Sequence, residues 1–462
     1  MSENDREQQE NPNQFSEQSD FLIEKIKERP VNKKKLFRRT LTTAAMAVMF
    51  GTIACVTFLI LEPVISNRLY PEEEPAPAPV VFPEDQEEMA PEDMLSENQT
   101  QENEENNEGE GVSLEQEQIR EILSGLVLNK ENYKQIYSAL SVYAAELNHS
   151  MVTVTGVSSN IDWFNNVEER KQQSSGVLIA NNGRELLVLV DYAPLQTAES
   201  LTLTSSFLDA TKSKSSPYQI PVSLKSHDPV TNLAILSVNL EDVPAQVREE
   251  GGLEIAVLGS SNSKNIIGTP VIALGSPMGS SGSMGYGIIT ATGSQNYQAD
   301  TNYKLLQTDI YGSQKAGGVL FNLQGQVIGV ITTESISSDM KNMVTAYGIS
   351  ELKKSIEKMS NGEEIAYLGI SGIDVSDEAY EELGVPYGAF VREVEMNSPA
   401  MNAGIQQGDV LTSFGERSIR NYNDYITALM QAEGGSTVEL TVMRTAHGEY
   451  REMKVIVTPG RR

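Results

Sequence analysis

The sequence predicts a mainly β chain with one membrane-spanning helix near its N-terminus and an α+β domain at its C-terminal end. Residues 148–360 contain short stretches in which apolar and polar side chains alternate between glycine-rich turns, a pattern that is typical of antiparallel strands. Residues 364–460 combine alternating strands with an amphipathic helical segment. Residues 40–61 carry no charged side chain, which is typical of a helix that crosses a bilayer.

The uncharged stretch TLTTAAMAVMFGTIACVTFLIL, residues 40–61, spans roughly 30 Å as a helix, which is the thickness of the hydrocarbon core of a bilayer. The tail before it, residues 1–39, is polar and ends in the basic cluster KKKLFRR. Because Lys and Arg stay on the cytoplasmic side, we expect a single-pass anchor with a cytoplasmic N-terminus and extracytoplasmic folded domains. A buried core helix and a cleaved signal peptide are the alternatives, but no small-x-small cleavage site follows the apolar stretch.

Residues 67–111 are predicted to form an acidic, disordered linker. From residue 71 onward this segment contains prolines and many acidic residues but neither Lys nor Arg, so we expect an extended stalk. An acidic binding tail is the alternative. Residues 112–147 carry apolar side chains at helical intervals, which predicts a helical segment that includes a helix over 131–143.

The composition excludes several classes of function. A formal net charge of −29 argues against nucleic-acid binding, because such binding depends on neutralising phosphates with Lys and Arg. The single cysteine, Cys55, excludes a disulfide within the chain and a thiolate metal cluster. The three histidines, His149, His227 and His447, have no neighbouring cluster of metal ligands, so neither a metal nor another cofactor is predicted.

Strands can be placed along the β-rich region from the alternation of side chains. The segment MVTVTG, which starts at residue 151, is the first, and an Asn-Asn-Gly turn joins SGVLIA and ELLVLV into a hairpin. Further strands are predicted near residues 201–205, 219–224, 233–238, 270–274 and 287–292. This pattern fits either a pair of barrels or a sandwich.

One segment, QTDIYGSQKAGGVLFNLQGQVIGV (residues 307–330), resembles the nucleophile region of the HtrA/Deg family of trypsin-like serine proteases, in which Asn-Ser-Gly-Gly precedes a strand–turn–strand. Further segments are similar to family motifs in the same order along the chain: SSGVLIA, DPVTNLAIL, LGSPMG, GIITA and MVTAYGISEL. The resemblance implies that residues 148–360 form a chymotrypsin-like pair of antiparallel β-barrels.

The family's catalytic residues are missing at the matching positions of this chain. A serine protease needs a hydroxyl nucleophile, an imidazole that takes its proton and a carboxylate that orients the imidazole. The resemblance places these roles at Ala316, Ala193 and Asn232, none of which can perform them. Gln314 replaces a family glycine in the turn that forms the oxyanion hole, and this turn is one residue shorter. The sequence therefore predicts a pseudoprotease.

The alternative is an active HtrA-like endopeptidase that uses a non-standard nucleophile and base. Ser313 lies close in sequence to the position of the lost serine, and His227 and Asp228 are neighbours. Adjacent side chains on a strand point to opposite faces, so His227 and Asp228 are poorly placed to act together as a relay.

The C-terminal domain, residues 364–460, resembles a PDZ domain. Its segment NSPAMNAGIQQGDVL is similar to the PDZ signature, with a short helix that a glycine ends in a left-handed cap. PDZ domains bind a peptide C-terminus as an added strand, and backbone N–H groups of one loop hold the carboxylate.

The PDZ resemblance implies a peptide site made by that loop and by one face of the helix that starts at Asn421. The implied peptide-binding residues are Tyr367, Leu368, Gly369, Ile370, Tyr425 and Leu429. The alternative is a groove that is filled from within the molecule.

Together these features predict a membrane-anchored HtrA-like pseudoprotease that binds peptide or unfolded-protein C-termini through its PDZ domain and acts in envelope protein quality control. The resemblance places the chain in a bacterial cell membrane. It also implies a homotrimer or a hetero-oligomer with active paralogues, because the family forms trimers. A purely structural partner within such an assembly is a further alternative.

Overall fold

The structure is a computed structural model. It describes residues 33–69, 77–85, 130–161, 167–205, 219–245, 253–294, 298–333 and 342–462. The chain divides into two units, Met1–Ala76 and Pro77–Arg462, and each is described by itself. The predicted tail up to residue 32, linker residues 70–76 and 86–111, and the first part of the helical segment, residues 112–129, lie outside the described residues.

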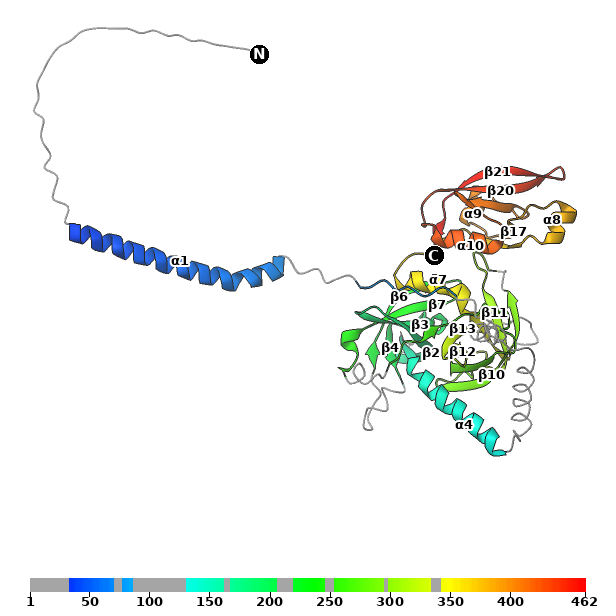
Figure 1. The fold of residues 1–462 in the computed structure, drawn as a ribbon, viewed down its shortest axis with the longest axis horizontal. Coiled ribbons are helices and arrows are strands. Elements are labelled where there is room, and N and C mark those ends of the chain that lie inside the picture. Colours follow the sequence, from blue (N-terminus) through cyan, green and yellow to red (C-terminus); the bar gives the residue numbers. More distant parts are fainter. Residues whose placement is uncertain are drawn as a thin grey trace, which may run out of the picture. The chain divides into compact units, whose positions relative to one another are not determined.

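The first unit contains helix α1 (Lys33–Leu69), drawn in blue in Figure 1. Within it, Phe37–Leu61 is a stretch of 25 residues with a mean hydropathy of 2.3 and no buried side chain, so it is long and apolar enough to cross a membrane. The hydroxyls of Thr42 and Thr43 donate to backbone carbonyls one turn earlier, which satisfies these polar groups inside the helix.

The second unit begins with two sheets, and the first of them is antiparallel throughout (Figure 1). Its strand order is β5-β4-β1-β2-β3-β7-β6. The strands are β1 (Met151–Ile161), β2 (Val167–Asn181), β3 (Glu185–Asp191), β4 (Ser200–Thr204), β5 (Ile220–Pro221), β6 (Ser223–Asp228) and β7 (Leu233–Asn239). Side chains from alternate positions, such as Val154, Leu178 and Leu236, pack into one core. The predicted hairpin is confirmed as β2 and β3, and Gly183 in its turn has a φ of 88°.

The second sheet has the strand order β12-β9-β10-β11-β14-β13-β8, and an additional pairing of β12 with β13 closes it into a barrel. Its strands are β8 (Val257–Leu258), β9 (Pro270–Ser276), β10 (Ser283–Ser294), β11 (Lys304–Tyr311), β12 (Gly317–Phe321), β13 (Gln326–Thr332) and β14 (Met343–Gly348). Only the short β8 pairs in parallel, with β13, among the described strands. Strands predicted at 270–274 and 287–292 correspond to β9 and to part of β10.

Helix α4 (Lys130–Leu147) leads through the 3-10 helix η1 (Asn148–Ser150) into β1. It contains the predicted helix over 131–143. Ala144 is fully buried, and a side chain on Gly325 would approach the hydroxyl of Tyr143 to 2.8 Å. The C-terminal end of the helix is therefore packed on the turn between β12 and β13.

Residues 77–85, which we call the strap, lie on helix α7 (Ile349–Ser360), the helix that follows β14. Asn361 at the end of α7 accepts a hydrogen bond from Val80 N–H (2.8 Å) and donates one from Nδ2 to Val80 O (2.9 Å). The Asn361 amide thus satisfies both backbone groups of one residue, as a neighbouring strand would. The Val80 side chain is buried in the core that also contains Ile356 and Met359.

The far end of the strap is held by an ion pair. Lys353 Nζ donates to Asp85 Oδ1 at 2.6 Å and to Pro83 O at 3.2 Å. Burial raises the pKa of the Asp85 carboxyl, but hydrogen bonds from Lys353 and two serines and the Lys353 charge outweigh burial, so the pKa lies below its ordinary value. Residues 77–85 of the predicted linker (67–111) are therefore bound to the folded domain. The prediction of an extended stalk is wrong for this part of the linker.

Replacing Lys353 with methionine is expected to speed hydrogen exchange of the Val80 and Phe82 amides about tenfold, because the strap loses its charged anchor. In the unchanged chain, protection is expected to be complete at neutral pH and to decrease as the pH falls below 3.8, because the folded-state pKa of Asp85 is depressed. Lys354→Met is the control, since Lys354 is exposed. Equal exchange in the two variants would contradict the anchoring role.

The C-terminal domain has one main sheet in the order β16-β17-β18-β20-β21, with β19 beside β18, and a separate β15–β22 pair. The strands are β15 (Ala366–Tyr367), β16 (Ile370–Asp374), β17 (Ala389–Val394), β18 (Val410–Phe414), β19 (Arg417–Ser418), β20 (Val438–Ala446), β21 (Glu449–Val457) and β22 (Gly460–Arg461). The helices are α8 (Asp377–Leu383), α9 (Pro399–Ala403) and α10 (Tyr422–Gln431).

Three predicted helix caps in this domain are confirmed. The Ser398 hydroxyl accepts from Met401 N–H at the start of α9, and Gly404 ends this helix with a φ of 87°. The Asn421 side chain accepts from Asp424 N–H at 2.7 Å and starts α10. The Asn421 cap fixes the start of α10, the helix that faces the predicted carboxylate loop.

Candidate functional site

The position of the family's nucleophile is Ala316, directly before β12. Ala316 is 7% exposed, and its methyl group belongs to a core cluster. Its N–H donates to Ser313 O at 2.9 Å, which closes a tight turn over residues 313–316. In trypsin-like enzymes the N–H of the nucleophile residue belongs to the oxyanion hole. Here that donor is already used within the turn.

The Gly-Gly pair after Ala316 has a structural role of its own. Gly318 has a φ of 112°, and a side chain there would lie 2.0 Å from Leu274 O. Only glycine fits this close approach of β12 to β9. Gly318 is therefore explained by packing alone and carries no information about catalysis.

The predicted position of the family's catalytic histidine is Ala193, at the start of the 3-10 helix η2 (Ala193–Leu195). Its side chain is exposed, and its N–H donates to Asp191 Oδ1 at 3.0 Å. Burial raises the pKa of the Asp191 carboxyl, and the hydrogen bond from Ala193 acts in the opposite direction. The Asp191 carboxylate therefore stabilises the turn at Ala193 by accepting a hydrogen bond from its backbone.

The predicted position of the family's catalytic aspartate is Asn232, between β6 and β7. Its carbonyl accepts from Tyr192 N–H at 2.8 Å, and its Oδ1 accepts from Gln196 Nε2 at 3.2 Å. The structure thus brings Asn232 against the turn that carries Ala193. Asn232 has a φ of 56°, a left-handed conformation that asparagine tolerates better than most residues.

The candidate substitutes Ser313 and His227 are not brought together. Ser313 N–H donates to Pro277 O at 3.1 Å, and its hydroxyl accepts from Lys315 N–H at 3.1 Å. The ring of His227 lies 5.0 Å from that of Tyr192, and its buried Nε2 has no hydrogen-bond partner among the described residues. Burial lowers the pKa of His227, and the Asp228 charge partly opposes this.

The other two histidines lie apart from these positions. His149 Nδ1 is 4.0 Å from Glu254 Oε1 at the start of β1, and His447 occupies a turn position with a φ of 56° between β20 and β21. The residues that the structure describes contain no group of three or more His, Cys, Asp or Glu side chains that fits a metal ion.

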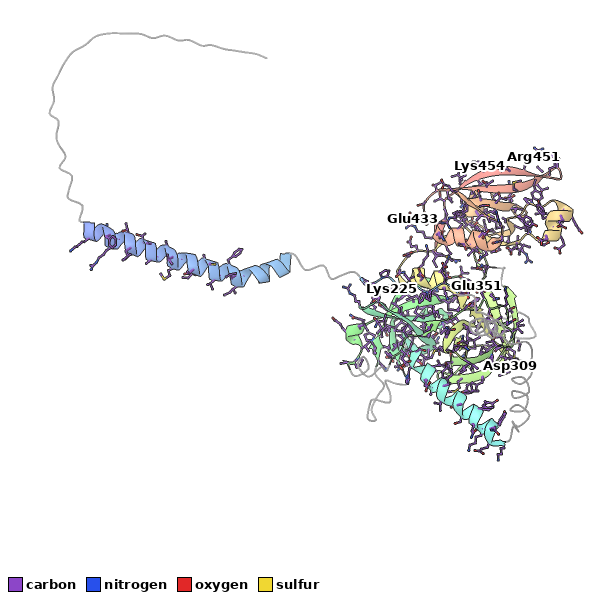
Figure 2. The ribbon with its side chains drawn as sticks, in the orientation of Figure 1. Lys225, Asp309, Glu351, Glu433, Arg451 and Lys454 are labelled. Atoms are coloured by element: carbon purple, nitrogen blue, oxygen red, sulfur yellow. The ribbon has the colours of Figure 1, made fainter. Side chains whose placement is uncertain are left out.

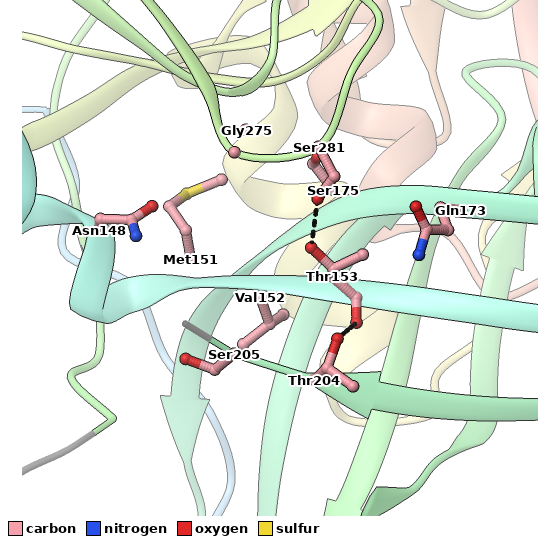
Figure 3. A pocket seen from close by; sticks show the side chains of 11 residues that line it. Asn148, Met151, Val152, Thr153, Gln173, Ser175, Thr204, Ser205, Gly275 and Ser281 are labelled. Atoms are coloured by element: carbon pink, nitrogen blue, oxygen red, sulfur yellow. Dashed lines mark hydrogen bonds between the residues drawn. The ribbon is translucent and has the colours of Figure 1, made fainter. Parts of the chain in front are cut away.

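A cavity of about 230 Å³ opens between β1, β2, β4 and the loop after β9 (Figure 3). Its polar lining consists of neutral hydroxyl and amide side chains, among them Thr153, Gln173, Thr204 and Ser281. The hydroxyls of Thr153 and Ser281 are 2.6 Å apart. Hydroxyls and amides bind by hydrogen bonding but are poor acids and bases near neutral pH. This lining therefore offers binding groups and no general base.

The predicted carboxylate loop does hold a carboxylate, and that carboxylate belongs to the chain itself. Asp300, between β10 and β11, accepts hydrogen bonds from the N–H groups of Leu368 (2.6 Å), Gly369 (2.7 Å) and Ile370 (3.1 Å). The Tyr425 hydroxyl also donates to Asp300. Gly369 has a φ of 85°, which turns the N–H groups toward one point.

The remaining predicted peptide-site residues are placed as follows. Tyr367 is half-buried, and its hydroxyl donates to Glu395. Leu429 on α10 is buried in the core of the domain. The loop and Tyr425 are thus brought together around the Asp300 carboxylate, whereas Leu429 packs in the core.

Sequence reasoning missed Asp300 and Tyr422. Burial raises the pKa of Asp300, and the hydrogen bonds from the loop and Tyr425 oppose this shift. Tyr422 on α10 donates its hydroxyl to Ile370 O at 2.8 Å. No local pattern marks Asp300, because it lies 68 residues before the loop. The sequence does offer a signal for Tyr422, because this residue directly follows Asn421, the predicted N-cap of the helix that forms one side of the peptide site.

The chain was compared with known proteins. Residues 174–330 match a trypsin-like peptidase domain and residues 366–457 match a PDZ domain, which confirms the predicted fold class. The chain is 27% identical over 355 residues to the serine protease Do-like HtrA of Lactococcus lactis subsp. lactis (strain IL1403), covering 72% of this chain and 80% of the relative.

It is 33% identical over 219 residues to a probable periplasmic serine endoprotease DegP-like of Marinomonas sp. (strain MWYL1), covering 45% of this chain and 43% of the relative. Among solved structures, it is similar to the HtrA-type protease AlgW with decapeptide, with 19% identity and a TM-score of 0.49 over 68% of this chain and 96% of that one. The domain order and the relatives from Lactococcus lactis and Marinomonas agree with the motifs in the sequence, and the chain belongs to the HtrA family of trypsin-like peptidases with a PDZ domain.

Proposed function

We propose that this chain is a membrane-anchored pseudoprotease of the HtrA family that binds peptide or unfolded-protein C-termini in envelope protein quality control. The closed turn at the nucleophile position carries this proposal. At Ala316 the hydroxyl is missing, and the backbone N–H that would stabilise an oxyanion is hydrogen-bonded to Ser313 O.

The side chains at the other two catalytic positions support the same conclusion. Ala193 offers no imidazole, and the amide of Asn232 accepts from Gln196 instead of orienting a histidine. Removing a full triad reduces turnover by about six orders of magnitude, and the activity that remains depends on the oxyanion hole. Without a free donor in that turn, no rate enhancement is expected.

The carboxylate loop supports the binding half of the proposal. Three convergent N–H groups and one tyrosine hydroxyl already hold a carboxylate in the PDZ domain. A peptide C-terminus offers the same group at the end of an extended strand. The loop therefore has the chemistry that a C-terminal peptide requires.

Helix α1 supports anchoring in a bacterial cell membrane. Lys34, Arg38 and Arg39 lie at its N-terminal end, which we propose to be cytoplasmic, so that the folded domains are extracytoplasmic. Assembly into homotrimers or with active paralogues is proposed from family membership. Co-purification of a tagged chain with an untagged copy or an active relative tests that assembly.

The purified full chain in detergent is expected to leave unfolded casein intact at an enzyme concentration at which an active relative digests it within minutes. The reason is the combined loss of nucleophile, base and oxyanion donor. Ser313→Ala is the matched control and is expected to change nothing. Casein cleavage by the unchanged chain that Ser313→Ala abolishes would establish a substitute nucleophile and refute the proposal.

A further inference from the structure

Asp300 contacts the PDZ domain through both its side chain and its backbone. Its carboxylate accepts from three consecutive backbone N–H groups of the carboxylate loop, and its own backbone N–H donates to Ile370 O at 2.8 Å. Asp300 is 1% exposed and has a φ of 55°. Asp300 thus gives a carboxylate to the loop and an N–H to the next strand. The last residue of a peptide bound as an added strand makes the same hydrogen bonds.

The groove beyond Asp300 is also occupied. The Tyr422 hydroxyl donates to the same Ile370 carbonyl, and its ring lies against β16. A side chain on Gly372 would approach the Tyr422 ring to 2.6 Å and Phe390 O to 2.7 Å. Tyr422 therefore packs against β16 and occupies Ile370 O, one of the acceptors that an added strand would use.

We infer that Asp300 is an internal ligand of the PDZ carboxylate loop, and that a peptide C-terminus binds only after Asp300 has left it. This inference rests on the proposed peptide-binding function and adds its regulation. The bound peptide would take the three N–H groups and Ile370 O from Asp300. Binding is then coupled to separation of the PDZ domain from the barrel that carries Asp300.

Other contacts between barrel and PDZ domain would also separate in such a release. Asn302 Nδ2 donates to Asn423 Oδ1 at 2.7 Å, a single exposed hydrogen bond. The guanidinium of Arg462 is buried 3.8 Å from Asp228 and has no hydrogen-bond partner among the described residues. Burial lowers the pKa of Arg462, but the charges of Tyr303, Asp228 and Asp300 outweigh burial and raise it, so separating the domains also breaks a favourable interaction.

The internal ligand reduces the apparent affinity for a peptide in proportion to the fraction of molecules in which the loop is free. Replacing Asp300 with alanine leaves the loop without a carboxylate. We expect such a variant to bind a peptide C-terminus at least about tenfold more tightly than the unchanged chain, which corresponds to a free loop in fewer than one molecule in ten.

Amide exchange of Leu368, Gly369 and Ile370 in the full chain tests the internal ligand without any peptide. Exchange is expected to be at least about tenfold faster in Asp300→Ala and Asp300→Asn than in the unchanged chain. Asp309→Ala is the control, because Asp309 also accepts a backbone N–H, from Ile288, but on the barrel alone. Unchanged exchange in β20 shows that the PDZ domain remains folded.

Fluorescence anisotropy with a pool of labelled decapeptides that end in a free Leu, Val or Phe carboxylate then separates the two claims, with C-terminally amidated peptides as controls. Faster loop exchange together with tighter binding of the free carboxylates supports both. Faster exchange without binding supports the internal ligand and refutes the proposed peptide binding. Equal exchange in all variants, or measurable binding with equal affinity of the unchanged chain and Asp300→Ala, overturns the internal ligand.

Discussion

Replacing Arg444 with methionine is expected to lower the free energy of unfolding of the PDZ domain by about 3 kcal/mol. Arg444 on β20 donates from Nε and Nη2 to the two oxygens of Asp409, each at 2.7 Å, and from Nη2 to Gly404 O. The Asp409 side chain is only 1% exposed, so its charge would be left buried. The expected loss is at the low end for a broken buried pair, because the Arg444 side chain is 25% exposed.

Native-state hydrogen exchange of the β20 amides in the full chain measures this loss, which corresponds to exchange about a hundredfold faster. Lys454→Met is the matched control, since Lys454 on β21 (Figure 2) pairs with Glu439 in solvent. Combining Arg444→Met with Asp409→Asn is expected to recover part of the stability by removing the buried charge. Equal exchange in Arg444→Met and Lys454→Met would show that the pair contributes nothing.

The parts of the fold that were predictable from sequence are those fixed by local chemistry. The alternation in ELLVLV predicts strand β3, and the Asn-Asn-Gly turn predicts its pairing with β2. Ser398 and Gly404 mark the two ends of α9, because a hydroxyl cap and a left-handed glycine need no distant partner. The candidate catalytic positions were proposed for a similar reason, since they lie within short motifs.

The contacts that were not predictable join segments far apart in the chain. Asp300 and the carboxylate loop are separated by 68 residues, and Val80 and Asn361 by 281. The prediction of an acidic linker overlooked three apolar residues, Val80, Val81 and Phe82, which interrupt a charged, proline-rich segment. Val80 is buried and Phe82 is partly buried against the core, whereas Val81 is exposed, and the sequence does not name the surface that covers the first two.

The proposed loss of catalysis is expected to involve the backbone as well as the side chains. Ala316→Ser, Ala193→His and Asn232→Asp together restore the three side chains of a triad. The turn at 313–316 would still use the residue 316 N–H for its own hydrogen bond to Ser313 O. Losing one oxyanion donor reduces turnover by about 10²–10³-fold. The triple variant is therefore expected to digest casein at least about a hundredfold more slowly than an active relative.

Rebuilding the turn separates the two contributions. Replacing Gln314 with glycine and adding one residue to the turn, on top of the triple variant, is expected to raise casein hydrolysis about a hundredfold by freeing the donor. The same turn in the otherwise unchanged chain is the control and is expected to stay inactive, because it has neither nucleophile nor base. If the triple variant alone matched the rebuilt one, the closed turn would be irrelevant to catalysis, and the side chains alone would account for its loss.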